Sequence, residues 1–417
     1  MNPAHKEVLK SLVRSGPLIR RELAEVQALY SMSSDELRSY QQRRFLQVVG
    51  AAFEKSSFYQ AWYKAHGLDI GDIRSLDDIE LLPVLTKDVL KAASQEILTG
   101  SRVAVVAANT SGTTGSPLTV FHSYKAIRLE QAYLRIRRAI CGFAWGSRLV
   151  SVRGLLGVRQ LAYRAPLMNT LFLSSYLISE ARARDYFEQI ESFRPNAIEG
   201  YPSSLYNLAL VFRDCGLSVA IPICFTSSET LFEFQRAVIE SVFRTKVFDF
   251  YGCTERVVAL SELPGRVGYF EDPGYSVCEF KDDSVIATSL INDSFPLIRY
   301  QLSDVVTLGQ NGEVQSISGR AEDVVVCHDG TRLGRLDHLF KDATGVDLAQ
   351  IVQRRVGHID VNVVLSPGGS EDVLRRVLMR LRQRASAEML DVSIRAVDRS
   401  EIIYSARGKY SLVRSYA

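Results

Sequence analysis

The sequence lacks several features that would assign it to a specialised class of protein. Its six cysteines are scattered without any C-x-x-C pair, which argues for reduced thiols in the cytosol and against a disulfide framework. No uncharged apolar run approaches the length of a membrane span, and residues 1–30 mix charged with apolar positions rather than forming a signal peptide. The formal net charge of +3 points to neither nucleic acid nor an acidic partner. We therefore expect a cytoplasmic protein that binds no membrane and no nucleic acid.

Helical patterns near the N-terminus are followed by a region in which short apolar runs alternate with helical patterns. Residues 34–65 carry apolar side chains at helical spacing, which predicts helices packed on a larger body. Between Leu149 and Tyr300 the strand candidates are 220–225 and 246–251, and the helix candidates are 185–193, 203–213 and 231–243. Such alternation is typical of an α/β domain with a mostly parallel sheet. Ligands on these sheets lie at the carboxyl ends of strands, so the loops that follow the strand candidates are the expected site.

The C-terminal part of the chain follows a different pattern. Ile359, Val361 and Val363 alternate with more polar residues, which predicts an edge-like strand. A helical face over 374–381 and a second alternating run over 390–394 follow it. These patterns predict a small α+β domain. We place its start after the turn-rich segment GQNGEVQSIS, which gives domains at 1–318 and 319–417.

One loop stands out for its small and hydroxylated residues. Residues 109–118 read NTSGTTGSPL and follow an apolar run, 103–108, that we predict to be a buried strand. Glycines let the backbone approach a ligand closely and hydroxyl groups add donors, so an anion such as phosphate is the expected guest. This is not the G-x-x-x-x-G-K-[ST] loop of common NTPases, because no Lys follows Gly115 and Pro117 interrupts a helix. Taken alone, such a decapeptide is also typical of an ordinary surface turn.

Five further segments accompany this loop in order along the chain. They are FTSSE (225–229), DFYGCTE (249–255), RYQLSD (299–304), GRAEDVVV (319–326) and GKY (408–410). Together they resemble the adenylate-forming superfamily, and more closely its branch of phenylacetate–CoA ligases and capsule-biosynthesis ligase-like proteins. The resemblance runs nearly end to end and includes LLPVLTKDVL (81–90), EGYPSSLYNLA (199–209) and FPLIRYQLSD (295–304).

This resemblance implies a large N-terminal adenylation domain, a small mobile C-terminal domain and a two-step ligation. A small carboxylic acid, with an aromatic acid preferred, would attack the α-phosphate of ATP in the presence of Mg²⁺ to give acyl-AMP and pyrophosphate. A thiol, with CoA preferred, would then displace AMP. Two alternatives stay open. The acyl group could pass to the pantetheine of an acyl carrier protein, or to an amine or hydroxyl in polysaccharide or secondary-metabolite biosynthesis; or the chain could bind nucleotide without turnover. The acid, the acceptor, the pathway and the choice between monomer and homodimer are not specified.

The resemblance also assigns the nucleotide site to residues of this chain. The loop Thr110–Gly115 would hold the β- and γ-phosphates as they leave, and Asp304 would accept hydrogen bonds from both ribose hydroxyls. Tyr251 would offer its ring to adenine, Asp249 would accept from the adenine amino group, and Arg320 would reach the ribose or a phosphate. The complete expected set is Thr110, Ser111, Gly112, Thr113, Thr114, Gly115, Ser228, Glu229, Asp249, Phe250, Tyr251, Gly252, Asp304 and Arg320.

The resemblance assigns catalysis to three residues and domain rotation to a fourth. Glu255 would bind Mg²⁺, which prefers carboxylate oxygens, and Thr254 would donate its hydroxyl to a phosphate oxygen. Lys409 would place its cation beside the charge that develops during adenylation. Asp323 would be the hinge about which the small domain rotates between the two half-reactions.

The sequence departs from the family pattern at two places, and the resemblance also assigns residues to the acyl pocket. The usual Thr-Gly before the ribose-binding Asp is Leu302-Ser303 here, and residues 257–269 contain none of the Cys and His of a zinc site known in some relatives. We therefore expect no structural metal. Tyr201, Phe225 and Ser227 are the expected lining of the acyl pocket.

Overall fold

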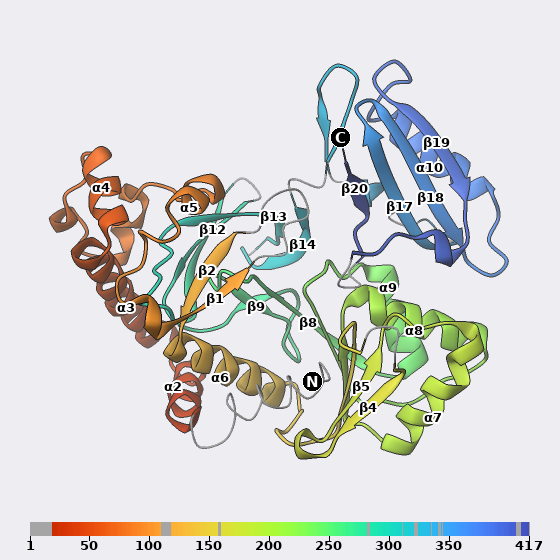
Figure 1. Ribbon diagram of the computed structural model, residues 1–417, viewed down its shortest axis with the longest axis horizontal. Coiled ribbons are helices and arrows are strands. Elements are labelled where there is room, and N and C mark those ends of the chain that lie inside the picture. The colour runs from red at the N-terminus through yellow and green to blue at the C-terminus, as the bar shows by residue number, and fades with distance from the viewer. Residues whose placement is uncertain are drawn as a thin grey trace.

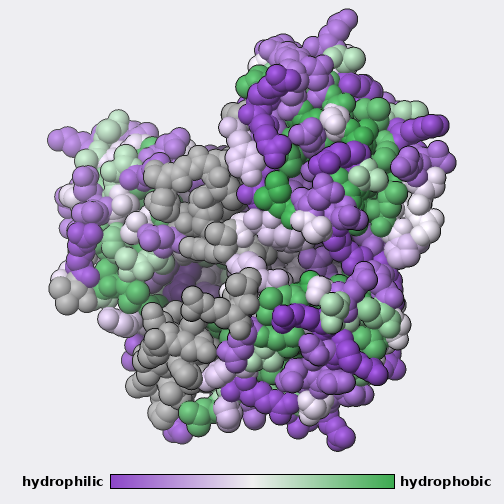
Figure 2. Space-filling view, turned by 45° about the vertical axis from the view of Figure 1, so that its right-hand side comes forward, coloured by the Kyte–Doolittle hydropathy of each residue, from purple (hydrophilic) through white to green (hydrophobic). Residues whose placement is uncertain are grey.

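The structure is a computed structural model that describes residues 19–109, 118–156, 160–281, 284–310, 312–320, 324–334, 336–340, 343, 345–405 and 410–416. Figure 1 shows the N-terminal helices at one side, an α/β region at the other, and the C-terminal part above α8 and α9. In the space-filling view the C-terminal part forms a separate upper lobe (Figure 2). No helix within the described ranges is both long and apolar enough to cross a membrane.

The N-terminal helices confirm the helical pattern predicted for 34–65. They are α2 (Arg20–Tyr30), α3 (Ser34–Lys55), α4 (Ser57–Ala65) and α5 (Lys87–Ala93). A capping box begins α3, because the Glu36 carboxylate accepts from the Ser33 backbone N–H at 2.9 Å while the Ser33 hydroxyl accepts from the Glu36 N–H. Ser56 ends α3, and its hydroxyl then accepts from the Tyr59 N–H and caps α4. Short 3₁₀ turns elsewhere are η2 (Ile70–Asp72), η3 (Leu76–Leu81), η4 (Arg102–Ala104), η5 (Pro166–Met168), η6 (Glu180–Arg182), η7 (Leu336–Leu339) and η8 (Arg399–Glu401).

The central sheet confirms the predicted α/β domain. Its strand order is β10-β9-β8-β7-β6-β3-β5-β4, and β5, β3, β6, β7 and β8 run parallel. The strands are β3 (Leu149–Arg153), β4 (Ala162–Ala165), β5 (Thr170–Ser174), β6 (Ala197–Gly200), β7 (Ile223–Ser227), β8 (Lys246–Gly252), β9 (Ala259–Ser261) and β10 (Phe270–Glu271). Alternate side chains of these strands pack into a core with α7 (Ala183–Phe193), α8 (Pro202–Asp214) and α9 (Glu233–Phe243), and the opposite face meets the end of α6 (Tyr124–Ile140).

A second, antiparallel sheet adjoins the end of β8. It consists of β11 (Ser276–Lys281), β12 (Ser284–Ser289), β13 (Tyr300–Leu308) and β14 (Val314–Arg320). Residues 81–90 dock on it: Leu85 bridges to Tyr300, and the Arg299 guanidinium binds the Glu279 carboxylate at 2.7 and 2.9 Å and the Leu82 carbonyl. Segments 81–90 and 295–304 lie far apart in the sequence, and this packing brings them into contact.

The strand predicted before the 109–118 loop forms but is not buried. It is β1 (Val105–Asn109), and it pairs in antiparallel register with β2 (Thr119–Ser123) alone. Val106 is exposed, and the strand contains no fully buried residue. The prediction of burial was wrong because β1 forms one strand of a two-stranded ribbon whose buried residues lie on β2.

The C-terminal residues form their own sheet and core. The elements are β15 (Val325–Val326), β16 (Arg332–Leu333), β17 (Val346–Arg355), β18 (His358–Leu365), α10 (Asp372–Arg382), β19 (Asp391–Ala396) and β20 (Val413–Ser415). The sheet order is β19-β18-β17-β20, so β18 is an interior strand and the prediction of an edge-like strand was wrong. Its alternation reflects one covered face, where Val361 and Val363 pack with Val377 and Leu381 of α10. The boundary near 319 stays a prediction, since β14 continues to Arg320 and 321–323 lie outside the described residues.

Candidate active site

Three of the predicted nucleotide-binding residues converge where β8 meets the second sheet. Tyr251 lies near the end of β8, and its hydroxyl donates to Asp304 Oδ2 at 2.7 Å. On the next strand of that sheet, Arg320 is the register partner of Asp304. Burial, followed by the Asp304 charge, raises the pKa of Tyr251 well above its usual range. The tyrosine therefore remains a hydrogen-bond donor to the carboxylate, which keeps the Asp304 side chain oriented.

The predicted phosphate-binding and metal-binding residues, Thr254 and Glu255, lie in the turn that follows β8. Thr254 is exposed and Glu255 is half-buried. The Tyr300 hydroxyl, at the start of β13, donates to Glu255 Oε1 at 3.4 Å. A partly exposed carboxylate oriented by a tyrosine, beside Asp304 on the adjoining strand, fits a hard divalent cation. The residue before Thr254 in the turn is Cys253, whose pKa is raised well above its usual range by burial, so this thiol is not a reactive thiolate.

Glu229 joins three separate segments of the chain through hydrogen bonds. Its Oε2 accepts from the Ser203 backbone N–H at 3.1 Å, in the first turn of α8, and its Oε1 accepts from the Tyr410 N–H at 3.0 Å. Ser228 before it has φ of 71°, which turns the chain sharply after β7. Glu229 therefore ties the end of β7 to α8 and to the C-terminal segment.

Tyr410 is anchored on both sides of the boundary between the two lobes. Besides its backbone bond to Glu229, its hydroxyl donates to the Ala349 carbonyl of β17. Its ring also packs near that of Tyr404, at 6.3 Å between centroids. Tyr410 directly follows Lys409 in the sequence. Lys409 itself, the loop residues Thr110 to Gly115 and the predicted hinge Asp323 lie outside the described residues.

Asp249 has internal partners that do not favour the predicted contact with adenine. It is buried in β8, where the Thr226 hydroxyl donates to its Oδ1 and the Tyr269 hydroxyl donates to its Oδ2 at 2.7 Å. Burial raises the pKa of this carboxyl group against the opposing effect of both hydroxyls. The arrangement gives Asp249 a role in joining β7, β8 and the segment before β10.

Phe250 and Gly252 support the same strand by packing. The Arg137 guanidinium of α6 lies over the Phe250 ring, 3.7 Å from its centroid. A Cβ on Gly252 would come within 2.7 Å of that ring, so the position needs glycine for packing. Both residues therefore shape the end of β8, from which Tyr251 and Glu255 project.

The predicted acyl-pocket residue Phe225 belongs to a row of side chains across the central sheet. Register pairs join Ser151, Glu199, Phe225 and Phe248, so these residues share one face. Phe225 meets the Phe143 ring edge to face at 6.0 Å between centroids. The other two predicted residues lie close in the chain to this row: Tyr201 precedes α8, and Ser227 ends β7.

Two arginines that contact this row of side chains were not predicted from the sequence. Arg138 of α6 pairs with Glu199, and Arg153 Nη2 at the end of β3 lies 3.4 Å from Glu199 Oε1. Burial by itself would raise the pKa of Glu199, but the charges of Arg153 and Arg138 outweigh burial and hold that pKa at about 2. Arg138 also lies 5.1 Å from the centroid of the Phe225 ring. The only available sequence signal was that Arg153 follows an apolar strand, which does not distinguish it from a solvated arginine.

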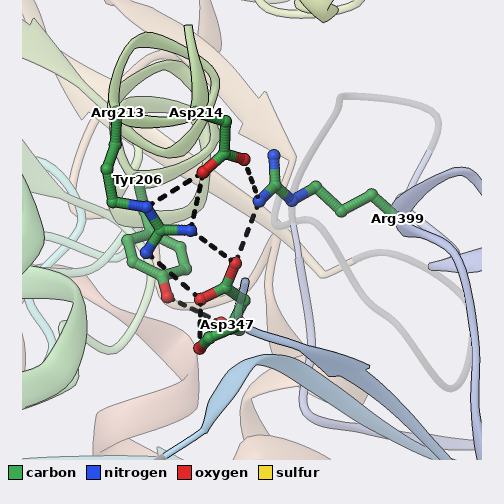
Figure 3. Close-up of polar contacts among 6 residues, drawn as sticks. Tyr206, Arg213, Asp214, Asp347 and Arg399 are labelled. Carbon is green, nitrogen blue, oxygen red and sulfur yellow. Dashed lines mark hydrogen bonds and ion pairs between the residues drawn. The ribbon is translucent and has the colours of Figure 1, made fainter. Parts of the chain in front are cut away.

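A polar network fixes the C-terminal lobe on α8 (Figure 3). At its centre the Asp347 carboxylate, nearly fully buried, binds Arg213 and Arg399, each at 2.9 Å to Oδ2. Arg399 also reaches Asp214 at 2.9 Å, and the Tyr206 hydroxyl donates to the Asp347 backbone carbonyl at 2.7 Å. Apolar side chains from the C-terminal lobe pack into the core behind α8 beside this network; they are Leu348, Val364 and Ile402.

Two curated proteins are similar to the chain over most of its length. No protein-family model matches the chain. The protein CapK of Staphylococcus aureus is 25% identical over 376 residues, covering 84% of this chain and 83% of CapK. The phenylacetate–coenzyme A ligase of Thermus thermophilus is 24% identical over 338 residues, covering 72% of this chain and 73% of that ligase.

A solved structure shares the fold across nearly the whole chain. The 2-hydroxyisobutyryl-CoA ligase in its postadenylation state has a TM-score of 0.65 and 17% identity, covering 92% of this chain and 90% of that one. The chain is therefore similar along most of its length to CapK and to acid–CoA ligases, as its resemblance to the adenylate-forming superfamily implies. The similar curated proteins include three phenylacetate–CoA ligases as well as CapK, which is the branch that the sequence resembles.

Proposed function

We propose that this protein activates a carboxylic acid with ATP to give acyl-AMP and pyrophosphate, and then transfers the acyl group to a thiol. The observation that carries the proposal is the hydrogen bond from Tyr251 to Asp304, whose register partner is Arg320, with Glu255 in the turn after β8 and Tyr410 docked on Glu229. Ribose hydroxyls are donors, and Asp304 is a carboxylate kept in place by a tyrosine. The neighbouring Glu255 offers a further anionic oxygen at the edge of the site.

The residues of this site divide the work of the first step. Glu255 would hold Mg²⁺, which would supply positive charge to neutralise the phosphate groups. Asp304 and Arg320 would hold the ribose, and the hydroxyl and backbone groups of the 110–115 loop would hold the departing pyrophosphate. Because Tyr410 is docked at the boundary between the lobes, the preceding Lys409 is proposed to place its ammonium beside the α-phosphate and the attacking carboxylate.

The acid is proposed to be aromatic and the acceptor to be CoA. Phe225 packs against the buried rings of Phe143 and Phe248, and this aromatic surrounding supports an aryl group beside Phe225, with Tyr201 and Ser227 as further lining. The Thermus thermophilus relative bears the name of an aryl-acid CoA ligase, which supports the thiol acceptor. The cytoplasmic location is proposed from the six free cysteines.

Acid-dependent exchange of labelled pyrophosphate into ATP tests the first step. We expect exchange with phenylacetate or a related aryl acid and none without acid. Lys409→Ala should lower exchange by about 100-fold or more, the scale for removing a preorganised charge-stabilising group. Lys91→Ala, at an exposed lysine of α5, is the control and should retain full exchange.

The acceptor is identified in a second assay with acyl-AMP supplied. CoA, a pantetheinylated carrier protein and free amines are offered in parallel, and consumption of acyl-AMP is followed. Product with CoA alone supports the proposal. Product formed only with the carrier protein, or only with an amine, would identify that molecule as the acceptor in place of CoA. Absence of pyrophosphate exchange with every acid would show that the protein binds nucleotide without turnover.

A further inference from the structure

A cluster of two histidines and one aspartate lies in the C-terminal lobe, away from the nucleotide site. His358 Nε2 is 2.8 Å from Asp391 Oδ2, and His328 Nε2 is 3.2 Å from the same oxygen. The two imidazole rings stand edge to face with centroids 4.9 Å apart. One ligand atom from each residue thus falls within 4.8 Å of the other two.

The hydrogen bond from Nδ1 of His358 leaves a neutral imidazole with no proton on Nε2, the nitrogen that faces Asp391. His358 Nδ1 lies 3.2 Å from the Val356 carbonyl, which can only accept, so Nδ1 carries the proton. Nε2 then faces Asp391 Oδ2, which is also an acceptor when ionised. A neutral imidazole has a single N–H, so this contact needs either a second proton or a cation between the two atoms. An imidazole whose far nitrogen donates to a backbone carbonyl is the usual arrangement of a metal ligand.

The backbone holds the three ligand-bearing segments together independently of their side chains. The Asp391 N–H donates to the Gly357 carbonyl at 2.8 Å, and the Gly357 N–H donates to the Val326 carbonyl at 2.8 Å. The His328 N–H donates to the Met389 carbonyl at 2.9 Å. Gly357 has φ of 78°, and a Cβ there would come within 2.1 Å of His328 Nδ1, so the ring lies directly against this turn. The site is therefore preorganised.

We propose that His328, His358 and Asp391 form a binding site for Zn²⁺. Two imidazole nitrogens and one carboxylate are ligands that zinc favours over Mg²⁺ or Ca²⁺. Tetrahedral coordination with bonds of about 2.0–2.1 Å places ligand atoms roughly 3.4 Å apart, so the observed 2.8 and 3.2 Å need only small adjustments. The three side chains are 31% to 57% exposed, which leaves room for water to complete the coordination. This departs from the expectation of no structural metal, which considered only the region after the Tyr-Gly motif.

The position of the site indicates a structural role. It joins the loop after β15, the β17–β18 turn and the start of β19. Asp347, at the α8 boundary, lies at the opposite end of β17 from Arg355, about 26 Å away for eight extended residues. Zinc would therefore fasten the outer end of the C-terminal lobe without touching the nucleotide, and its loss should lower stability before it affects the adenylation chemistry.

The test uses the full-length protein after chelation and dialysis, titrated at pH 7.5 with ZnCl₂ by calorimetry and with CoCl₂ by visible absorption. We expect one Zn²⁺ per chain, with a rise in Tm on binding. His358→Ala and Asp391→Asn should each weaken Zn²⁺ binding by at least about tenfold, equivalent to about 1.4 kcal/mol. His66→Ala, at an exposed histidine after α4, is the control and should bind as the wild type does.

Two checks make the outcome decisive. The metal-free variants should melt at the wild-type temperature, which separates a lost ligand from a lost fold; if one variant does not fold, the other is used. In the Co²⁺ complex, d–d bands should change in Asp391→Asn but not in His66→Ala. Wild-type protein that binds no Zn²⁺, or affinity that is equal in wild type and both ligand variants, would overturn the proposal in favour of hydrogen bonding between protonated imidazoles and Asp391.

Discussion

At the scale of single residues, Asp304 is the clearest test of the nucleotide site. Replacing it with Asn keeps an acceptor for the Tyr251 hydroxyl but removes the charge that would bind the ribose. Because a hydrogen bond to a charged group contributes about 1.5–3 kcal/mol, we expect the KM for ATP to rise by roughly tenfold or more. Pyrophosphate exchange over a range of ATP concentrations measures this, with Asp360→Asn on β18 as the control.

The contact with ribose can be isolated by changing the ligand as well. Wild-type enzyme should discriminate strongly between ATP and 2′,3′-dideoxy-ATP, whereas Asp304→Asn should discriminate weakly, since each change removes the same interaction. Additive effects of the two changes would place the ribose elsewhere.

Glu199 provides a pH-dependent test of the arginine-lined row. Its pKa of about 2 lies below the ordinary value of 4.5, so the charged form stabilises the folded state above pH 4.5. That stabilisation, about 3 kcal/mol at neutral pH, should be lost as the pH falls from 4.5 towards 2. Urea unfolding of wild type and Glu199→Gln should therefore differ more at pH 6 than at pH 3.5. A difference that is constant with pH would show that the arginines do not hold the carboxylate charged; Glu54→Gln on α3 serves as the control.

At the scale of elements, the boundary between α8 and the C-terminal lobe depends on one buried carboxylate with two arginine partners. Removing Asp347 would leave both arginines without their shared anion, so a milder change is more informative. Arg399→Ala removes one partner and leaves Arg213 on Asp347. We expect the adenylation rate to fall by about three- to tenfold, because roughly 1 kcal/mol of docking energy is lost.

The second half-reaction distinguishes docking from general damage. With acyl-AMP supplied, thioester formation by Arg399→Ala should stay at the wild-type rate, since the predicted rotation of the lobe would break this contact. Arg354→Ala, a more exposed arginine near the far end of β17, should leave both steps unchanged. Equal slowing of both steps by Arg399→Ala would contradict a role in docking.

At the scale of the whole molecule, the arrangement of the two lobes resembles one state of a related fold more than another. The TM-score is 0.65 against the postadenylation state of the 2-hydroxyisobutyryl-CoA ligase and 0.54 against its thioesterification state. Both TM-scores are against the same ligase, so the difference between them reflects how the parts of that ligase are placed in its two states. The network around Asp347 and the bonds of Glu229 are the contacts that hold this arrangement.

Rotation between such states is the basis for a prediction at Asp323. Proline fixes φ near −65° and removes an N–H donor, so Asp323→Pro should hinder the movement and leave the contacts of Tyr251 and Asp304 in place. We expect acyl-AMP to form and accumulate on the enzyme, with the second step slowed at least about tenfold, equivalent to about 1.4 kcal/mol of added barrier. A single-turnover quench measures the intermediate. Wild-type rates for both steps in a normally folded variant would exclude a hinge at this residue.

The sequence by itself determined the α/β class, the small α+β domain and most helix and strand positions. These depend on hydrophobic periodicity and helix capping, which act within a few residues, as at Ser33 and Ser56. The order of the motifs gave the resemblance to the superfamily and selected Tyr251 and Asp304, which the structure joins by a hydrogen bond.

Only the tertiary structure decided which distant side chains meet. The pairing of Arg138 with Glu199, the bonds from Glu229 to α8 and Tyr410, and the cluster of His328, His358 and Asp391 depend on strand register and on how each helix is rotated about its sheet. Neither quantity is encoded within one segment, because both follow from packing between elements far apart in the chain. For the same reason β18 could be predicted as a strand from its alternation, whereas its interior position in the sheet required its neighbours.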